Sequence, residues 1–165
     1  MSIFSSTKML LASLAVISSF AILSGCAMPA PAAMVTPFNV NEHSSYAGAG
    51  TSTITGSAFS VTKGGDVKIP AGNTLYLIPL TTYSKEALQK YYYFQLGGTQ
   101  AAELKPYIRK TQIDAAGNFS FSNIPSGTYK LITDHTWKVG SNTTGGDIQA
   151  TATVKPNETV KVIVQ

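Results

Sequence analysis

The sequence has few of the residues that catalytic and metal sites require. It contains one cysteine, Cys26, and two histidines, His43 and His135, among 165 residues. A zinc site needs several Cys, His, Asp or Glu ligands at characteristic spacings, and no HExxH-type spacing occurs. A single cysteine also excludes an internal disulfide, so apolar burial has to stabilise the fold. We therefore expect no metal and no cofactor.

Charged residues are also scarce. The chain has 12 Lys and Arg against 8 Asp and Glu, a formal net charge of +4, and Arg109-Lys110 is the only adjacent basic pair. Nucleic-acid binding requires clustered basic residues, so nucleic acid is not an expected partner.

Catalytic patterns are absent as well. No serine lies in a GxSxG setting, and the carboxylates show no paired arrangement. Asp134 and His135 are adjacent on a predicted strand, so they should point to opposite faces and cannot pair as in a triad. We do not expect an enzyme.

No apolar run reaches the roughly 20 residues that span a bilayer as a helix. The longest, Met9–Leu23, is interrupted by three serines, follows Lys8 and ends at Leu23-Ser24-Gly25-Cys26. A positive residue, an apolar stretch and small residues before a cysteine resemble a bacterial lipoprotein signal peptide with its lipobox, over residues 1–25. In such lipoproteins the Cys26 sulfur receives a diacylglyceryl group, the chain is cut before Cys26, and the new amino group is acylated.

The resemblance implies that the partner is a membrane, held through the lipid anchor, and that the protein lies in the bacterial cell envelope. Ala27 after the cysteine implies the outer membrane, facing the periplasm or the cell surface. The alternative is an ordinary secretory signal, cut near Ala30-Pro31-Ala32 or Ala32-Ala33.

The segment after the lipobox lacks an apolar period. Pro29, Pro31 and Pro37 predict extended backbone, so residues 26–50 are expected to form a flexible tether that includes His43. Gly48-Ala49-Gly50 should mark its end, which leaves residues 51–165 as the folded domain.

The domain is predicted to be all-β, an antiparallel sandwich of about seven strands. Gly56 suggests a bulge or a close approach of another chain segment, and Pro79 should lie at an edge or at a strand's end. Gly64-Gly65, Gly97-Gly98 and Gly145-Gly146 are interpreted as turns. The predicted strands are Thr51–Thr62, Thr74–Leu80, Ile108–Asp114, Phe119–Ser122, Thr128–Trp137 and a final hairpin of Ile148–Val154 with Thr159–Val164.

A helical insertion is expected over residues 84–107. Ser84 should be its N-cap, with Glu86 in the first turn. Leu88, Tyr91, Tyr92 and Leu96 have helical spacing, and Gly97-Gly98 should end the helix.

One run of the sequence resembles a known family. Asp114, Gly117, Phe119, Phe121, Ile124-Pro125, Gly127, Tyr129 and Leu131 follow the pattern of the carboxypeptidase regulatory-like domain. The resemblance covers 51–165 and implies a transthyretin-like, or prealbumin-like, sandwich. It does not imply a peptidase, because in this family the domain is the non-catalytic one.

Two places could bind a partner. Tyr91, Tyr92, Tyr93 and Phe94 are consecutive, and on a helix they cannot all face one core, so they either cover the sandwich or present exposed aromatics. His135 and Trp137 form the second candidate, with Trp137 as a core residue or as a platform for a sugar ring.

We therefore expect a lipid-anchored envelope protein whose non-catalytic sandwich acts as an interaction or scaffold module. Its partner would be an unidentified envelope protein or a glycan. The alternatives are a carbohydrate- or peptidoglycan-binding module and an envelope hydrolase with an unrecognised site.

Overall fold

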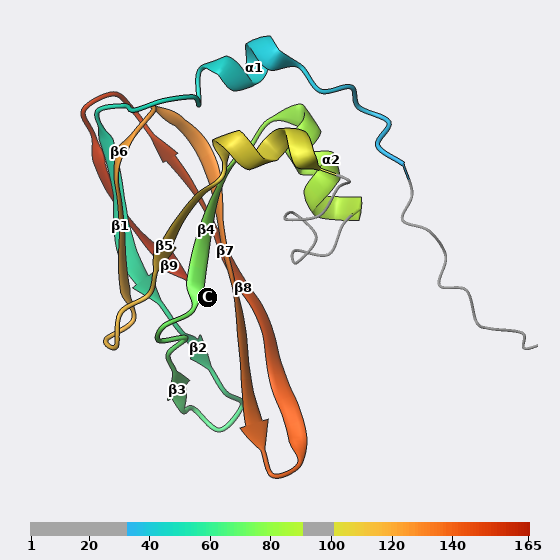
Figure 1. Ribbon diagram of the computed structural model, residues 1–165. Helices are drawn as coiled ribbons and strands as arrows, with labels where there is room; N and C mark the ends of the chain where they lie inside the picture. Colours follow the sequence, from blue (N-terminus) through green and yellow to red (C-terminus); the bar gives the residue numbers. More distant parts are fainter. Residues whose placement is uncertain (1–32, 91–100) are drawn as a thin grey trace, which may run out of the picture. The chain divides into compact units, whose positions relative to one another are not determined.

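The computed structural model describes residues 33–90 and 101–165 (Figure 1). The strands lie in a three-stranded sheet (β6-β1-β9), a four-stranded sheet (β5-β4-β7-β8) and a two-stranded sheet (β2-β3). Within these stretches no helix is long and apolar enough to cross a bilayer. The strands are β1 (Ser52–Ala58), β2 (Ser60–Val61), β3 (Val67–Lys68), β4 (Thr74–Pro79), β5 (Arg109–Gln112), β6 (Asn118–Ile124), β7 (Gly127–Val139), β8 (Asn142–Val154) and β9 (Thr159–Val164). The helices are α1 (Val40–Ser44), α2 (Thr82–Lys90) and the 3₁₀ helix η2 (Ala102–Tyr107).

The main core lies between the three-stranded and four-stranded sheets. Alternate residues of β1 are buried, as expected for a strand with one face on a core. Ile54 of β1 and Phe121 of β6 pack there with Leu77 of β4 and Leu131 of β7. The prediction of a mostly β domain with antiparallel sheets and a short helical segment is confirmed. The predicted close approach at Gly56 is also confirmed, because a Cβ on Gly56 would lie 1.8 Å from the Val162 carbonyl oxygen.

The predicted C-terminal hairpin is wrong. β8 pairs with β7, and β9 pairs with β1, in parallel, in the other sheet. The turn at 155–158 therefore connects the two sheets, and the Glu158 carboxylate accepts a bond from the Lys155 amide at 2.7 Å. Two neighbouring apolar strands joined by a turn look alike in sequence whether they pair with each other or face each other across a core.

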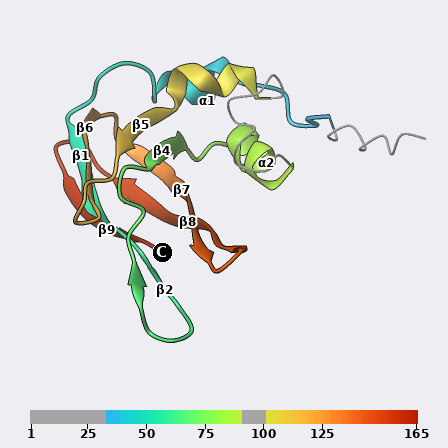
Figure 2. The same cartoon turned by 60° about the horizontal axis from the view of Figure 1, so that its bottom comes forward.

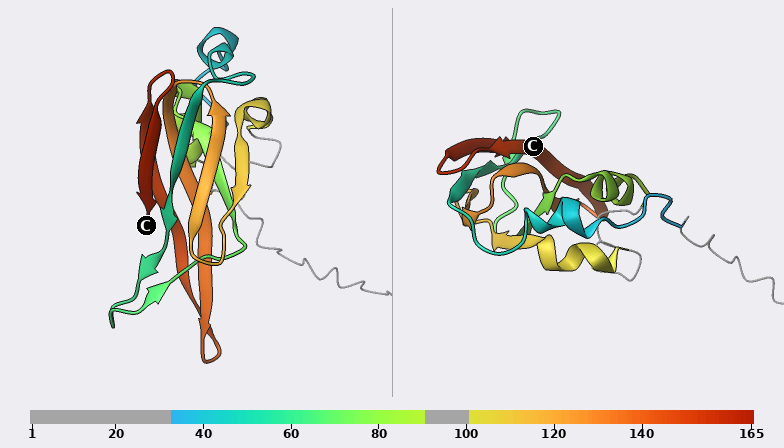
Figure 3. Two further views of the ribbon diagram at one scale, coloured as in Figure 1. Left: turned by 90° about the vertical axis from the view of Figure 1, so that its left-hand side faces the viewer. Right: turned by 90° about the horizontal axis from the view of Figure 1, so that it is seen from above.

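A helical layer covers the opposite face of the four-stranded sheet. Tyr83 and Ala87 of α2, with Leu104 of η2, pack on Ile78 and Ile132 of the sheet as a second core. Seen from above, α1, α2 and η2 lie on the side of this sheet away from β9 (Figure 3). The middle of this sheet, at Ile78 of β4 and Ile132 of β7, is therefore covered on its outer face as well.

Helix α2 begins two residues before the predicted position, and Thr81 rather than Ser84 caps it. The Ser84 amide donates to Thr81 Oγ1 at 3.1 Å, while the Thr81 amide donates to Ser84 Oγ at 2.8 Å. This reciprocal pair is a capping box with serine in place of the usual Glu or Gln. Ser84 Oγ also donates to the Pro79 carbonyl at 2.5 Å, which ties the helix to the end of β4.

The flexible tether predicted over 26–50 does not apply to residues 33–50, which pack against the domain. Met34 and Phe38 contact the second core, and the His43 side chain is fully buried. His43 Nε2 lies 2.9 Å from Thr81 Oγ1, at the cap of α2. The packed unit thus begins before Thr51, because this segment supplies apolar side chains that cover α2 and η2. We call residues 33–46 the N-terminal strap.

Glu86 of α2 fastens the strap. Its carboxylate accepts the amides of Val35 at 2.7 Å and Thr36 at 2.6 Å, and it pairs with the Lys90 ammonium at 2.7 Å. The Lys90 contact, with the Thr36 and Val35 hydrogen bonds, lowers the pKa of Glu86 from 4.5 to about 2. Ionised Glu86 is therefore stabilised in the folded state, and this contribution is lost as the pH falls from 4.5 through about 2.

We predict that the amide proton shifts of Val35 and Thr36 titrate with a midpoint near pH 2 rather than near 4.5. NMR spectra recorded across this range measure it, with the Leu131 amide in the main core as the reporter of global unfolding. In Glu86→Gln this titration should disappear and both amides should shift toward solvent-exposed values. A midpoint at the ordinary glutamate pKa would contradict the proposed fastening.

Candidate functional site

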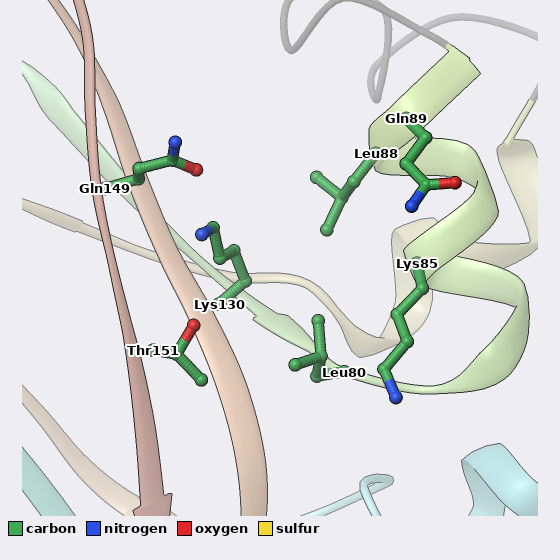
Figure 4. Close-up of a pocket in the computed structure, with 7 residues that line it drawn as sticks. All are labelled: Leu80, Lys85, Leu88, Gln89, Lys130, Gln149 and Thr151. Carbon is green, nitrogen blue, oxygen red and sulfur yellow. The ribbon is translucent and has the colours of Figure 1, made fainter.

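A pocket of about 250 Å³ lies between α2 and the outer face of the β7–β8 pair (Figure 4). It is open to solvent on one side, and it combines hydrogen-bonding side chains with two leucines. Its lining residues are Leu80, Lys85, Leu88, Gln89, Lys130, Gln149 and Thr151.

Strand register places the sheet side of the pocket. Lys130 lies directly opposite Thr151, and Ile132 lies opposite Gln149. Directly opposed residues of an antiparallel pair share a face, so Lys130, Thr151 and Gln149 form one polar patch. Leu131, between two of these positions on β7, points the other way into the main core.

Helix α2 supplies the facing wall. Lys85, Leu88 and Gln89 are spaced three and four residues apart and therefore lie on one side of the helix. Another side carries Tyr83 and Ala87 into the second core. The burial that fixes α2 on the sheet thus also fixes the width of the pocket.

The electrostatics of the outer face change along β7. Across 33–90 and 101–165, the Lys130 side chain makes no hydrogen bond or ion pair, and no carboxylate lines the pocket. Further along the same face, Asp134 lies opposite Asp147. Burial, and then the neighbouring Asp134 charge, raise the pKa of Asp147. The outer face of the β7–β8 pair therefore carries a positive charge, Lys130, near α2. It carries negative charges, Asp134 and Asp147, further along the two strands.

Most of the predicted functional residues lie outside the described residues. These are the lipobox residues Leu23, Ser24 and Gly25, the lipidation site Cys26, and the aromatic run Tyr91, Tyr92, Tyr93 and Phe94.

His135 and Trp137 are brought together, but away from the pocket. Their rings are tilted, with centroids 5.2 Å apart, on the face of β7 opposite Lys130. His135 is buried, and its Nδ1 lies 2.7 Å from Ser60 Oγ, so it links β7 to β2. Burial lowers the pKa of His135, although nearby Asp134 partly opposes the shift. Trp137 is half-buried, two residues before the end of β7, where it lies opposite Thr144 of β8.

The predicted turn at Gly145-Gly146 is wrong, since both glycines lie within β8. Gly145 has φ of 104°, and a Cβ there would lie 2.7 Å from the Trp137 ring and 2.2 Å from the His135 carbonyl oxygen. The glycine is thus required by a left-handed backbone and by the indole that covers it. In the sequence, a glycine pair in a strand under an indole cannot be distinguished from a glycine pair in a turn.

The pocket residues were not among the predicted site residues. The two-residue spacing in the sequence puts Lys130 and Ile132 on the same face of their predicted strand. Their placement opposite α2 was not predicted, because it depends on the pairing of β7 with β8 and on the second core.

In the described residues, no group of three Cys, His, Asp or Glu side chains could hold a metal ion. The arrangement at the pocket instead offers ammonium, amide and hydroxyl groups beside apolar carbon. These groups suit the binding of a polar ligand with apolar patches.

No family model matches the chain, and no curated protein matches it. A solved structure from Pseudomonas aeruginosa, PA1324, described as a putative carbohydrate binding protein, has the same fold. The two chains are 24% identical, with a TM-score of 0.60, and the similarity covers 78% of this chain and 97% of the other.

We predict that Gly145→Ala destabilises the domain by about 1–3 kcal/mol, the usual cost of overpacking, and shifts the emission of the single tryptophan, Trp137, toward that of an exposed indole. Chemical denaturation followed by fluorescence measures both effects. Gly146→Ala is the matched control, because a Cβ at Gly146 meets nothing within 4 Å and its φ is not positive. Equal effects of the two substitutions would show that the indole does not cover Gly145.

Proposed function

We propose that this domain binds carbohydrate in the pocket between α2 and the β7–β8 face. The observation that carries the proposal is the lining itself. Gln89 and Gln149 amides, the Thr151 hydroxyl and the Lys130 ammonium lie beside Leu80 and Leu88 (Figure 4). Sugar rings present hydroxyl groups at their edges and C–H groups on their faces, and a site of this composition can contact both.

Two further considerations support the proposal. A carbohydrate-binding role is ascribed to the Pseudomonas aeruginosa protein of the same fold. The proposed lipoprotein signal would direct the chain to the bacterial envelope, where glycans and peptidoglycan are abundant. We also propose that the domain binds its ligand without catalysing a reaction.

The anchor is proposed from the sequence. We infer that residues 1–25 are removed and that Cys26 carries the lipid, which would hold the domain at the outer membrane. The strap would then join the anchor to the domain, because its residues from Ala33 onward precede α1 and pack beside α2.

The sandwich is further proposed to be a carboxypeptidase regulatory-like, or transthyretin-like, domain. Contacts among its motif residues support this proposal. The Asp114 carboxylate accepts the Asn118 amide at 2.7 Å, and Gly117 has φ of 87° in the same turn. The Tyr129 hydroxyl donates to the Pro125 carbonyl at 2.7 Å.

Protein docking is the second candidate. Val61, Val67, Ile69 and Val139 are exposed on β2, β3, the segment after it and the end of β7. Figures 1 and 2 show the β2–β3 hairpin and the end of the β7–β8 hairpin at the same end of the domain. If these side chains form one patch, it would suit a protein contact.

We predict that the purified domain, residues 31–165, binds members of a glycan array or insoluble peptidoglycan. Gln89→Leu combined with Thr151→Val should weaken that binding about tenfold or more, because two hydrogen-bonding groups are lost. Thr159→Val on β9 is the matched control outside the pocket. Absence of any glycan or peptidoglycan binding would contradict the proposal and favour the docking role.

We predict that Cys26→Ser releases the protein from the membrane fraction, since lipidation requires the sulfur. Fractionation of cells and mass spectrometry of the N-terminal peptide measure the outcome. Continued membrane association of the Cys26→Ser variant, with an unmodified N-terminus in the parent, would exclude the lipid anchor.

A further inference from the structure

We propose that the saccharide bound in the α2 pocket carries a negatively charged group, and that Lys130 binds this group. The inference rests on the proposed carbohydrate-binding function and specifies the class of ligand.

Lys130 has the position of an anion-binding residue. It extends from β7, an interior strand of the four-stranded sheet, and its side chain is half-buried beside Gln149 (Figure 4). No hydrogen bond or ion pair involves it in the part of the chain that the structure describes. A partly desolvated ammonium without a partner gains from a charge-assisted hydrogen bond more than an exposed one does.

The surroundings leave the lysine's charge uncompensated. The other polar groups of the lining include the Gln89 amide, the Thr151 hydroxyl and a second ammonium, Lys85 at the rim. Each of them can donate a hydrogen bond to an anionic oxygen.

The acidic residues of α2, β7 and β8 lie outside the pocket lining. Glu86 of α2 is held by Lys90 and the strap amides. Asp134 is four residues beyond Lys130 on the same face, about 13 Å along an extended strand, and Asp147 lies opposite Asp134, two residues beyond Gln149 on β8. An anion at the α2 end therefore meets two ammonium groups and no carboxylate in the pocket lining.

The apolar part of the lining distinguishes a charged sugar from a free inorganic anion. The side chains of Leu80 and Leu88 lie in the pocket between Lys130 of β7 and helix α2 (Figure 4). A phosphate or sulfate ion has nothing to place against them, whereas the C–H face of a pyranose ring does. The expected ligand thus joins an anionic group to a sugar ring.

The test uses an array of uronic-acid and sialic-acid oligosaccharides, each paired with its methyl ester, together with sulfated glycans and their unsulfated forms. The two kinds of pair distinguish a carboxylate from a sulfate ester. We expect residues 31–165 to bind the charged member of a pair about tenfold more tightly than the neutral one. This preference should diminish as the salt concentration rises.

Lys130→Met should remove the preference by lowering affinity for the charged member only, whereas Lys130→Arg should retain it. Lys161→Met, at an exposed position of β9 in the other sheet, is the matched control. Equal binding of charged and neutral members by the parent domain would overturn the inference and leave carbohydrate binding intact. Binding of no glycan at all would instead remove the proposed function itself.

Discussion

The middle of strand β7 contacts a hydrophobic core on each of its two faces, and the rest of the domain is arranged around this constraint. Tyr129 and Leu131 enter the main core between the sheets, whereas Ile132 enters the second core under α2 and η2. The two-residue period of a strand puts Lys130 on the helical side, where α2 leaves it partly open. A shift of one residue in register would bury the ammonium in the main core.

The helical layer depends on a polar cap as much as on apolar packing. Thr81 and Ser84 satisfy each other's backbone amides, and buried His43 from the strap reaches Thr81. Glu86 holds the strap on the next turn of the helix. The same helix forms one wall of the pocket, so the strap braces the candidate site.

The candidate site illustrates where sequence patterns lose information. Trp137 and His135 were conspicuous as rare residues, but the structure uses His135 to bond Ser60 and lays Trp137 over Gly145. Lys130 and Thr151 were inconspicuous, because lysine and threonine alternating with apolar residues are typical of any solvent-facing strand. They line a pocket only because α2 packs over their face of the sheet.

The sequence by itself determined the mostly β character, most strand positions, the turn at Asp114–Gly117 and the inward-facing aromatics Phe119 and Phe121, since these depend on local alternation and turn chemistry. Only the tertiary structure decided which strands pair. It placed β9 parallel to β1, extended β8 through Gly145, and packed the proline-containing strap onto α2. Each of these outcomes depends on contacts between residues far apart in the chain, whose free energy no local pattern expresses.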